Sequence, residues 1–134
     1  MLVPAIHFPN TCAEAHKLYK KAFDMTVNRI TYYSDVSADY HDEPLTDETW
    51  NLIMHSECTI CGIRINMSDT GGTIKTDGMI HFNIFLSSED DVLKAFNVLK
   101  EGGVVESEPQ PVFWSSLHCS LKDRFGISWQ IMTE

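Results

Sequence analysis

The chain has 134 residues, the length of one domain or of two small modules that share a core. Its hydrophobic fraction of 43% is ordinary for a globular protein and excludes a disordered one. The formal net charge of -9 argues against nucleic acid as a partner, because phosphates attract Lys and Arg. No apolar run approaches the roughly 18 residues of a membrane span, and no signal peptide is visible, so we expect a cytoplasmic protein without a membrane partner.

The first half of the chain predicts a strand and a helix followed by three strands. The helix has apolar residues at helical spacing, and Thr11 with Glu14 three residues later forms a capping box at its start. Runs of β-branched and aromatic residues, bounded by turn residues, predict the strands. The predicted elements are a strand over residues 2–8, a helix over 12–23, and strands over 26–33, 50–60 and 63–68.

An acidic segment interrupts these strands. Residues 34–49 carry six acidic side chains and no Lys or Arg. Their spacing does not fit an EF-hand, which needs Gly at its sixth position and a closing Glu at its twelfth. We therefore expect a solvated loop and not a calcium site.

The second half begins with the same order of elements. A strand is predicted over residues 79–86, and Ser88 caps a helix that ends at Gly102-Gly103. A short strand is expected at Val104-Val105. Pro109 and Pro111 should keep the next connection out of the interior of a strand ladder.

The chain closes with a predicted β-hairpin. Two strands flank a turn over residues 122–126, in which Asp123 and Gly126 supply backbone conformations that most residues resist. We thus expect an α+β fold in which two βαβββ modules pair into a curved, largely antiparallel sheet with helices on the convex face. The expected boundaries are 1–70 for the first module, with the acidic loop over 34–49, then a linker over 71–78 and the second module over 79–134.

The four cysteines are expected to be free thiols, since no secretion signal is visible. Cys58 and Cys61 have the C-x-x-C spacing, but they lie in a predicted strand and not at a helix N-terminus, where a thiolate is stabilised. No second C-x-x-C is present to complete a zinc site. We interpret these residues as structural.

Five stretches of the chain match the pattern of one family, in the same order. Together they resemble the PhnB-like branch of the glyoxalase/bleomycin-resistance (vicinal oxygen chelate) superfamily. The stretches are CAEAHKLY at 12–19, MHSE at 54–57, ICG at 60–62, INMSD at 65–69 and FWSSLHCSLKDRFGISWQIM at 113–132. The resemblance implies paired βαβββ modules with a ligand pocket on the concave face, and it implies a homodimer.

The metal enzymes of this superfamily hold a divalent ion with one residue from the first and last strand of each module. By the resemblance these positions fall on Pro4, Asn66, His81 and Gln130. Pro4 cannot ligate through its side chain, and a neutral amide such as Asn66 brings no charge to balance the ion. His7 is expected to face the other way by the two-residue period of a strand, and a shift of one residue would turn it inward.

Without a metal, the same positions still provide a polar floor for a pocket, and Trp114 could supply an aromatic wall. His55 and Glu57 lie on one strand face, as an acid–base or metal pair or as a structural hydrogen-bonded pair. His81 is either a pocket residue or a satisfied core histidine. The candidate ligand-binding residues are His81, Gln130, Asn66, Trp114, His55 and Glu57, and the candidate metal ligands are His81 and Gln130.

Two functions follow from this resemblance. The first is a protein that binds a small organic ligand in its concave face; the alternative is a divalent-metal-dependent lyase, isomerase or dioxygenase of the vicinal oxygen chelate type. The sequence leaves open whether the protein is an enzyme. The two weak positions of the quartet favour a protein without a metal cofactor over one with a divalent ion. No Gly-rich turn between a strand and a helix predicts a nucleotide-like cofactor.

Overall fold

The computed structural model describes residues 1–71, 74 and 78–134. Of the predicted linker over 71–78, only residues 71, 74 and 78 are therefore described. The chain divides into two compact units, one of Met1–Lys17 with Met25–Ile74 and the other of Leu18–Asp24 with Lys75–Glu134. Within the described residues, no helix is long and apolar enough to cross a membrane.

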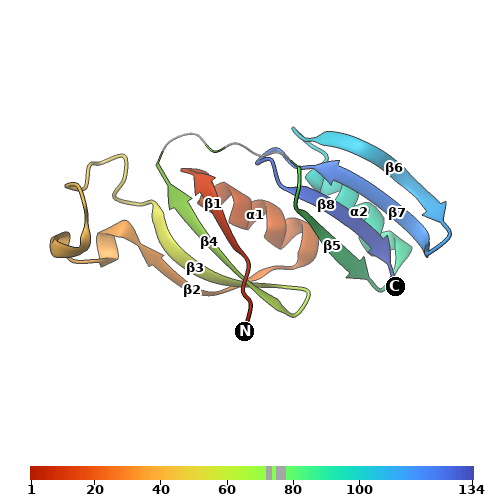
Figure 1. The fold of residues 1–134 in the computed structure, drawn as a ribbon, viewed down its shortest axis with the longest axis horizontal. Helices are drawn as coiled ribbons and strands as arrows, with labels where there is room; N and C mark the ends of the chain where they lie inside the picture. The colour runs from red at the N-terminus through yellow and green to blue at the C-terminus, as the bar shows by residue number, and fades with distance from the viewer. Residues whose placement is uncertain (72–73, 75–77) are drawn as a thin grey trace. The chain divides into compact units, whose positions relative to one another are not determined.

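The first unit contains a four-stranded mixed sheet (Figure 1). Its strand order is β1-β4-β3-β2, in which β1 pairs with β4 in parallel and the other neighbours are antiparallel. Two short 3-10 helices, Tyr33–Asp35 and Ala38–Tyr40, lie in the predicted acidic loop. The elements are β1 Ala5–Pro9, α1 Cys12–Phe23, β2 Thr26–Tyr32, β3 Ile53–Ile60 and β4 Ile63–Thr70.

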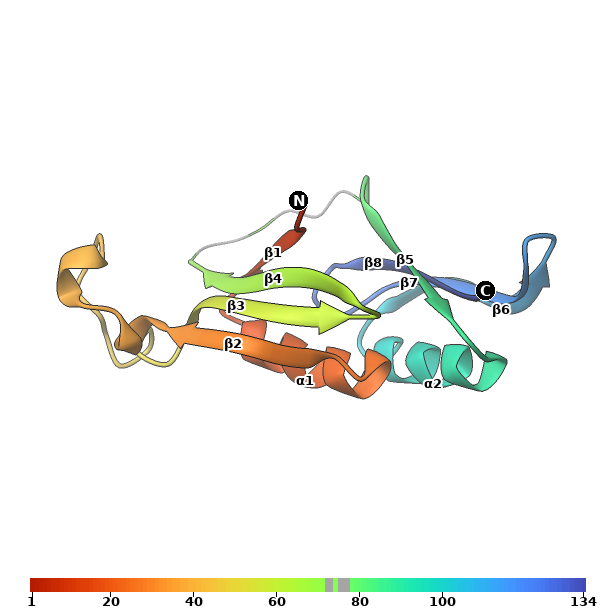
Figure 2. The ribbon, with the colours of Figure 1, turned by 90° about the horizontal axis from the view of Figure 1, so that it is seen from below.

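The second unit repeats this architecture with the strand order β5-β8-β7-β6, and β5 is parallel to β8. Figure 2 shows α2 on one side of this sheet. The elements are β5 His81–Leu86, α2 Glu89–Leu99, β6 Val104–Val112, β7 Ser115–Lys122 and β8 Ser128–Thr133. The predicted α+β class is confirmed, since each unit has the βαβββ order and an open, largely antiparallel sheet.

The core of each unit lies between its sheet and a helix. Alternate side chains of a strand point to this side, as Ile6 and Phe8 do in β1. In β8, Trp129 and Ile131 are fully buried in the same way. The opposite face of each sheet therefore carries the polar side chains of the alternating pattern.

The start of α1 differs from the prediction. The buried Thr11 Oγ1 has no hydrogen-bond partner among the described residues, so the predicted capping box is wrong. The cap comes instead from Asp69 at the end of β4, whose Oδ1 accepts from the Cys12 backbone N–H at 2.8 Å. A carboxylate at a helix N-terminus is favourable because it meets free N–H groups and the positive end of the helix dipole.

Two other predictions of local structure have different outcomes. The cap of α2 is confirmed, because Ser88 Oγ accepts from the Asp91 backbone N–H at 3.1 Å. The strand at Val104 is longer than predicted, since β6 continues through Pro109 and Pro111 to Val112. The prolines are tolerated because β6 is an edge strand with register shifts against β7, and an edge leaves N–H positions unpaired.

The turn between β7 and β8 is organised by one buried carboxylate. Asp123 accepts from the backbone N–H groups of Phe125 and Ile127 at 2.9 and 3.1 Å. Its other oxygen accepts from Tyr19 Oη and from Trp129 Nε1, both at 2.8 Å. The same side chain therefore fixes the turn and joins it to the end of α1 that belongs to this unit.

Candidate functional site

Three of the predicted pocket residues, His81, Gln130 and Trp114, lie at the uncovered face of the second sheet. We call it the second open face and define it by His81, Asn83, His118 and Gln130, which lie opposite α2. His81 is exposed, and its Nε2 donates to the Gly78 carbonyl oxygen at 3.0 Å, so it is not a core histidine. Asn83 and Gln130 are register partners on the adjacent strands β5 and β8.

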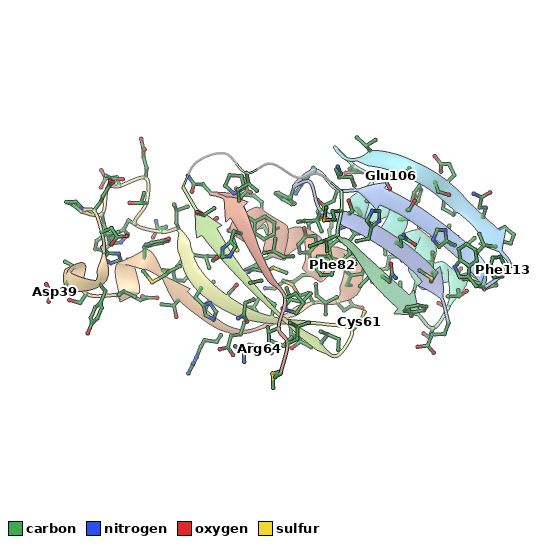
Figure 3. The ribbon with its side chains drawn as sticks, in the orientation of Figure 1. Asp39, Cys61, Arg64, Phe82, Glu106 and Phe113 are labelled. Carbon is green, nitrogen blue, oxygen red and sulfur yellow. The ribbon has the colours of Figure 1, made fainter. Side chains whose placement is uncertain are left out.

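An aromatic and polar chain crosses this face from the β6–β7 turn. The Trp114 ring lies edge-on to the His118 ring, with 5.6 Å between their centroids. His118 Nε2 lies 3.3 Å from Gln130 Oε1, so the imidazole donates to the amide oxygen. The Trp114 ring also contacts the ring of Phe113 at the turn. Figure 3 labels Phe113 at the end of this hairpin. The structure thus brings Gln130 and Trp114 together through His118.

The other predicted residues lie on the uncovered face of the first sheet, which we call the first open face. Glu57 and Asn66 are register partners on β3 and β4. Arg64, which Figure 3 labels, joins them, because its Nη2 lies 3.0 Å from Glu57 Oε1 and its Nε donates to Asn66 Oδ1 at 3.1 Å. His55 Nε2 is 3.9 Å from the same Glu57 oxygen. The carboxylate of the predicted His55–Glu57 pair therefore forms its shorter ion pair with Arg64.

His7 lies on the first open face, contrary to the prediction. Ile6 and Phe8 on either side of it point into the core, and its Nδ1 is 2.8 Å from Ser68 Oγ on β4. Ala5 pairs with Asn66 and His7 with Ser68. The predicted metal position at Pro4 is therefore displaced by one residue from the residues of β1 that face the open side of the sheet. The resemblance could not set this register, because β1 and β4 are far apart in the chain.

On β1 and β4 of the first sheet, and separately on β5 and β8 of the second sheet, the donors of the open face fit a divalent metal poorly. The first pair of strands offers the His7 imidazole and the Asn66 amide, and the second pair offers the His81 imidazole and the amides of Asn83 and Gln130, with no carboxylate on the open side of either pair. Hard divalent cations prefer charged oxygen ligands. In the described part of the chain, no three His, Cys, Asp or Glu side chains are grouped to hold a metal ion.

Four buried side chains between α1 and the first sheet form a further polar cluster. Ser56 Oγ donates to the Met67 carbonyl oxygen at 2.8 Å, so it must accept from His16 Nε2 at 2.9 Å. The sulfurs of Cys12 and Cys58 lie 3.6 and 3.7 Å from that nitrogen. Since Nε2 carries the proton, it is not available as a base for either thiol.

The thiols themselves are poor nucleophiles. Burial, with the nearby negative charge of Asp69, raises the pKa of Cys12 from 9.0 to about 12. Burial also raises the pKa of Cys119 from 9.0 to about 11. All four cysteines are free, and Cys61 is the exposed one. The interpretation of C-x-x-C as structural fits the buried position of Cys58 and the pKa of Cys61, which partial burial raises, because a reactive cysteine needs a lowered pKa.

The fold and the two open faces define the class of the protein. Two βαβββ units with open curved sheets and uncovered polar faces are the architecture of the glyoxalase/bleomycin-resistance superfamily. The model of the family described as 3-demethylubiquinone-9 3-methyltransferase matches residues 1–132. The chain belongs to this family, the PhnB-like branch of the superfamily.

Solved structures support the fold. The PhnB protein from Bacillus cereus is 18% identical, with a TM-score of 0.81, and the match covers 99% of this chain and 98% of that one. Protein PA1353 from Pseudomonas aeruginosa is 24% identical, with a TM-score of 0.81 and coverage of 100% and 97%. The fosfomycin resistance protein FosX from Mesorhizobium loti is 10% identical, with a TM-score of 0.64 and coverage of 100% and 90%. No curated protein matches the chain.

Sequence reasoning missed His118 as a member of the second open face. His118 directly precedes Cys119, which is fully buried on the opposite side of β7. The signal was present, because a residue that alternates with a buried cysteine points to the uncovered face. The 5.6 Å contact with Trp114 had no such signal, since it depends on the conformation of the β6–β7 turn.

Proposed function

We propose that this PhnB-like protein binds a small organic ligand on the concave face of its sheets, and that the second open face supplies the main contacts. The observation that carries the proposal is the connected set of Trp114, His118 and Gln130 on a face that α2 does not cover. An aromatic wall beside a few fixed polar groups is the usual composition of a small-molecule site.

The contacts favour a ligand with a flat apolar part and a hydrogen-bonding group. The Trp114 ring is half exposed and offers a surface for stacking. The Gln130 amide accepts from His118, so its N–H groups remain to donate to a ligand oxygen. The side chain of Asn83 on the neighbouring strand adds a second amide at the same level of the sheet.

The test is a thermal-shift screen of the full chain with small aromatic and drug-like compounds. We expect at least one compound class to stabilise the protein, since a ligand that binds only the folded state raises its stability by mass action. Trp114→Ala and Gln130→Ala should each weaken binding of a hit by about five- to fiftyfold. Val104→Thr, on the exposed start of β6, is the control and should bind normally. A screen without any stabilising class would overturn the proposal.

A metal-dependent enzyme of the vicinal oxygen chelate type is the second candidate. The observation that favours it is the placement of His7 on the same face as Asn66, which adds an imidazole to the donor set. Metal analysis of the purified chain, with added nickel, zinc, manganese and iron, tests it. Tight binding that is lost in His7→Ala and His81→Ala would support this function over the metal-free one.

We further propose that the chain forms a homodimer. In each unit taken by itself, the outer strands are unpaired along one edge, β1 and β2 in the first and β5 and β6 in the second. Exposed edges favour pairing with another chain unless they are covered. Sedimentation equilibrium is expected to give twice the monomer mass, and a monomer at micromolar concentration would contradict this.

A further inference from the structure

A cavity in the first unit lies apart from both open faces. Its volume is about 610 Å³, within the range of roughly 300–1,000 Å³ that is typical of small-molecule sites. Its walls come from the turn before α1, the segment between β2 and β3, and the end of β4. None of the residues that define the open faces lines it.

The floor of this cavity is fixed by the buried Asp69. Its Oδ1 accepts from the Cys12 N–H and its Oδ2 from the Ile53 N–H, both at 2.8 Å. Tyr33 Oη donates to the Asp69 carbonyl oxygen at 3.4 Å, which holds the tyrosine against the end of β4. Both carboxylate oxygens already accept backbone N–H groups, so Asp69 serves as a support for the cavity and not as its binding group.

Aromatic side chains form one wall of the cavity. The rings of Tyr33 and His41 stack with their centroids 5.9 Å apart and their planes 30° from parallel. His41 Nε2 donates to the Val36 carbonyl oxygen at 2.9 Å, which fixes the imidazole in this orientation. Tyr40 lines the cavity as well, and its ring is largely exposed. A wall that is held in place before binding lowers the ordering cost of a ligand.

The charge around the cavity is negative. Asp42 and Glu43 line it, and no Lys or Arg is among the described residues that do so. The segment over residues 34–49 contains six acidic residues and no Lys or Arg. A concave site lined by one sign of charge concentrates the opposite ion, and the faces of aromatic rings attract cations as well.

We propose that this cavity, the Tyr33–His41 pocket, binds a small organic ammonium ion. The rings of Tyr33, Tyr40 and His41 would contact its alkyl groups, and Asp42 and Glu43 would balance its charge. A bare metal ion fits less well, because it needs several oxygen ligands and the described residues contain no group of three metal-ligating side chains. The proposal assigns a ligand separate from the one on the second open face.

The test uses the full chain and benzyltrimethylammonium as the probe, with binding measured by titration calorimetry at low salt. Benzyl alcohol and benzoate are the neutral and anionic comparisons. We expect the ammonium ion to bind at least about tenfold more tightly than benzyl alcohol, with no binding of benzoate. Added salt should weaken the binding, because the carboxylates lie near the surface.

A matched pair of double variants separates a site from a general charge effect. Asp42→Asn with Glu43→Gln should weaken ammonium binding by about three- to tenfold, and Tyr40→Ala by a similar factor. Asp47→Asn with Glu48→Gln removes the same charge from the same segment, but neither residue lines the cavity. This control should change the affinity less than about twofold, because a site depends on contacts within the cavity.

Three results would overturn the proposal. The first is no measurable binding of the ammonium probe, and the second is equal weakening by the two double variants. The third is loss of ammonium binding in Trp114→Ala, which would place the probe on the second open face and leave the proposed function intact. Circular dichroism melting of each variant ensures that a loss of binding does not reflect unfolding.

Discussion

Single buried carboxylates determine much of the local structure of this protein. Asp69 joins the start of α1 to the start of β3, and Asp123 joins the β7–β8 turn to Tyr19 and Trp129. In both cases a charged group is buried because several donors replace its water shell. Removal of either acid would leave buried donors without a partner, which costs more than the loss of an ordinary surface hydrogen bond.

Substitution Asp123→Ala should therefore lower the free energy of unfolding by about 2–4 kcal/mol, since two backbone N–H groups, the Tyr19 hydroxyl and the Trp129 indole lose their acceptor. Asp123→Asn keeps one acceptor oxygen and should cost less. Urea denaturation measures both, and Asp47→Ala on the exposed acidic segment is the control. A change below about 0.5 kcal/mol for Asp123→Ala would contradict this role.

Thiol reactivity should differ among the four cysteines. At about pH 8, iodoacetamide should modify the exposed Cys61 while Cys12, Cys58 and Cys119 stay protected, because only an accessible thiolate reacts. Mass spectrometry of the native protein measures the labelling. In denaturant all four thiols should react. Labelling of Cys12 in the native state as fast as Cys61 would show that the cluster around His16 opens readily.

The raised pKa of Cys12 predicts a loss of stability in alkali. The unfolded thiol ionises near its ordinary pKa of 9.0, while the folded one keeps its proton up to about 12. The contribution to stability is therefore complete below 9.0 and is lost as the pH rises toward about 12. Between about pH 8 and pH 10.5, the urea midpoint of Cys12→Ala should fall less than that of the unmodified chain. Equal falls would show that other groups account for the alkaline transition.

At the scale of elements, turns and edges explain where strands begin and end. β6 tolerates two prolines because it is the outer strand of its sheet. The β3–β4 hairpin turns at Cys61 and Gly62, both with positive φ, of 49° and 79°. This pair of conformations suits the right-handed twist of a two-residue hairpin, and Asn-Gly adopts it with less strain than Cys-Gly.

Two substitutions in this turn should have opposite effects. Gly62→Ala should destabilise the protein by about 1 kcal/mol, because alanine resists the positive φ at this position. A clash does not contribute, since a Cβ at Gly62 meets no atom within 4 Å. Cys61→Asn should stabilise it by about 0.5 kcal/mol. Gly71→Ala is the control, since its φ is not positive and its surroundings are also open. Thermal melts of the three variants measure the order, and a stabilising Gly62→Ala would contradict it.

At the scale of the whole molecule, α1 belongs to both compact units. Its residues up to Lys17 group with the first unit, while Leu18–Asp24 group with the second. Within the second unit, the rings of Tyr19 and Phe23 lie 5.3 and 5.0 Å from the buried Trp129. A helix that supplies part of the core of each unit should make their folding interdependent.

A fragment of residues 79–134 should therefore not fold alone, because Trp129 would lose the aromatic partners that α1 supplies. The full chain should unfold in one cooperative transition, and Phe23→Ala in it should cost about 3 kcal/mol. Nuclear magnetic resonance of the fragment and denaturation of the full chain measure these outcomes, with Leu2→Ala as the exposed control. A fragment with a dispersed spectrum and a cooperative melt would show that the second unit is autonomous.

The order of the elements and the family could be read from the amino-acid sequence. Helical spacing, strand alternation, the cap at Ser88 and the turn residues around Asp123 act within a few residues, so α1, α2 and the final hairpin could be predicted. The cap of α1 by Asp69, the position of His7 on the first open face, and the contact between Trp114 and His118 became visible only in the folded chain. The same holds for the Tyr33–His41 pocket. These features depend on the register of distant strands and on loop conformation, where a shift of one residue turns each side chain to the opposite face.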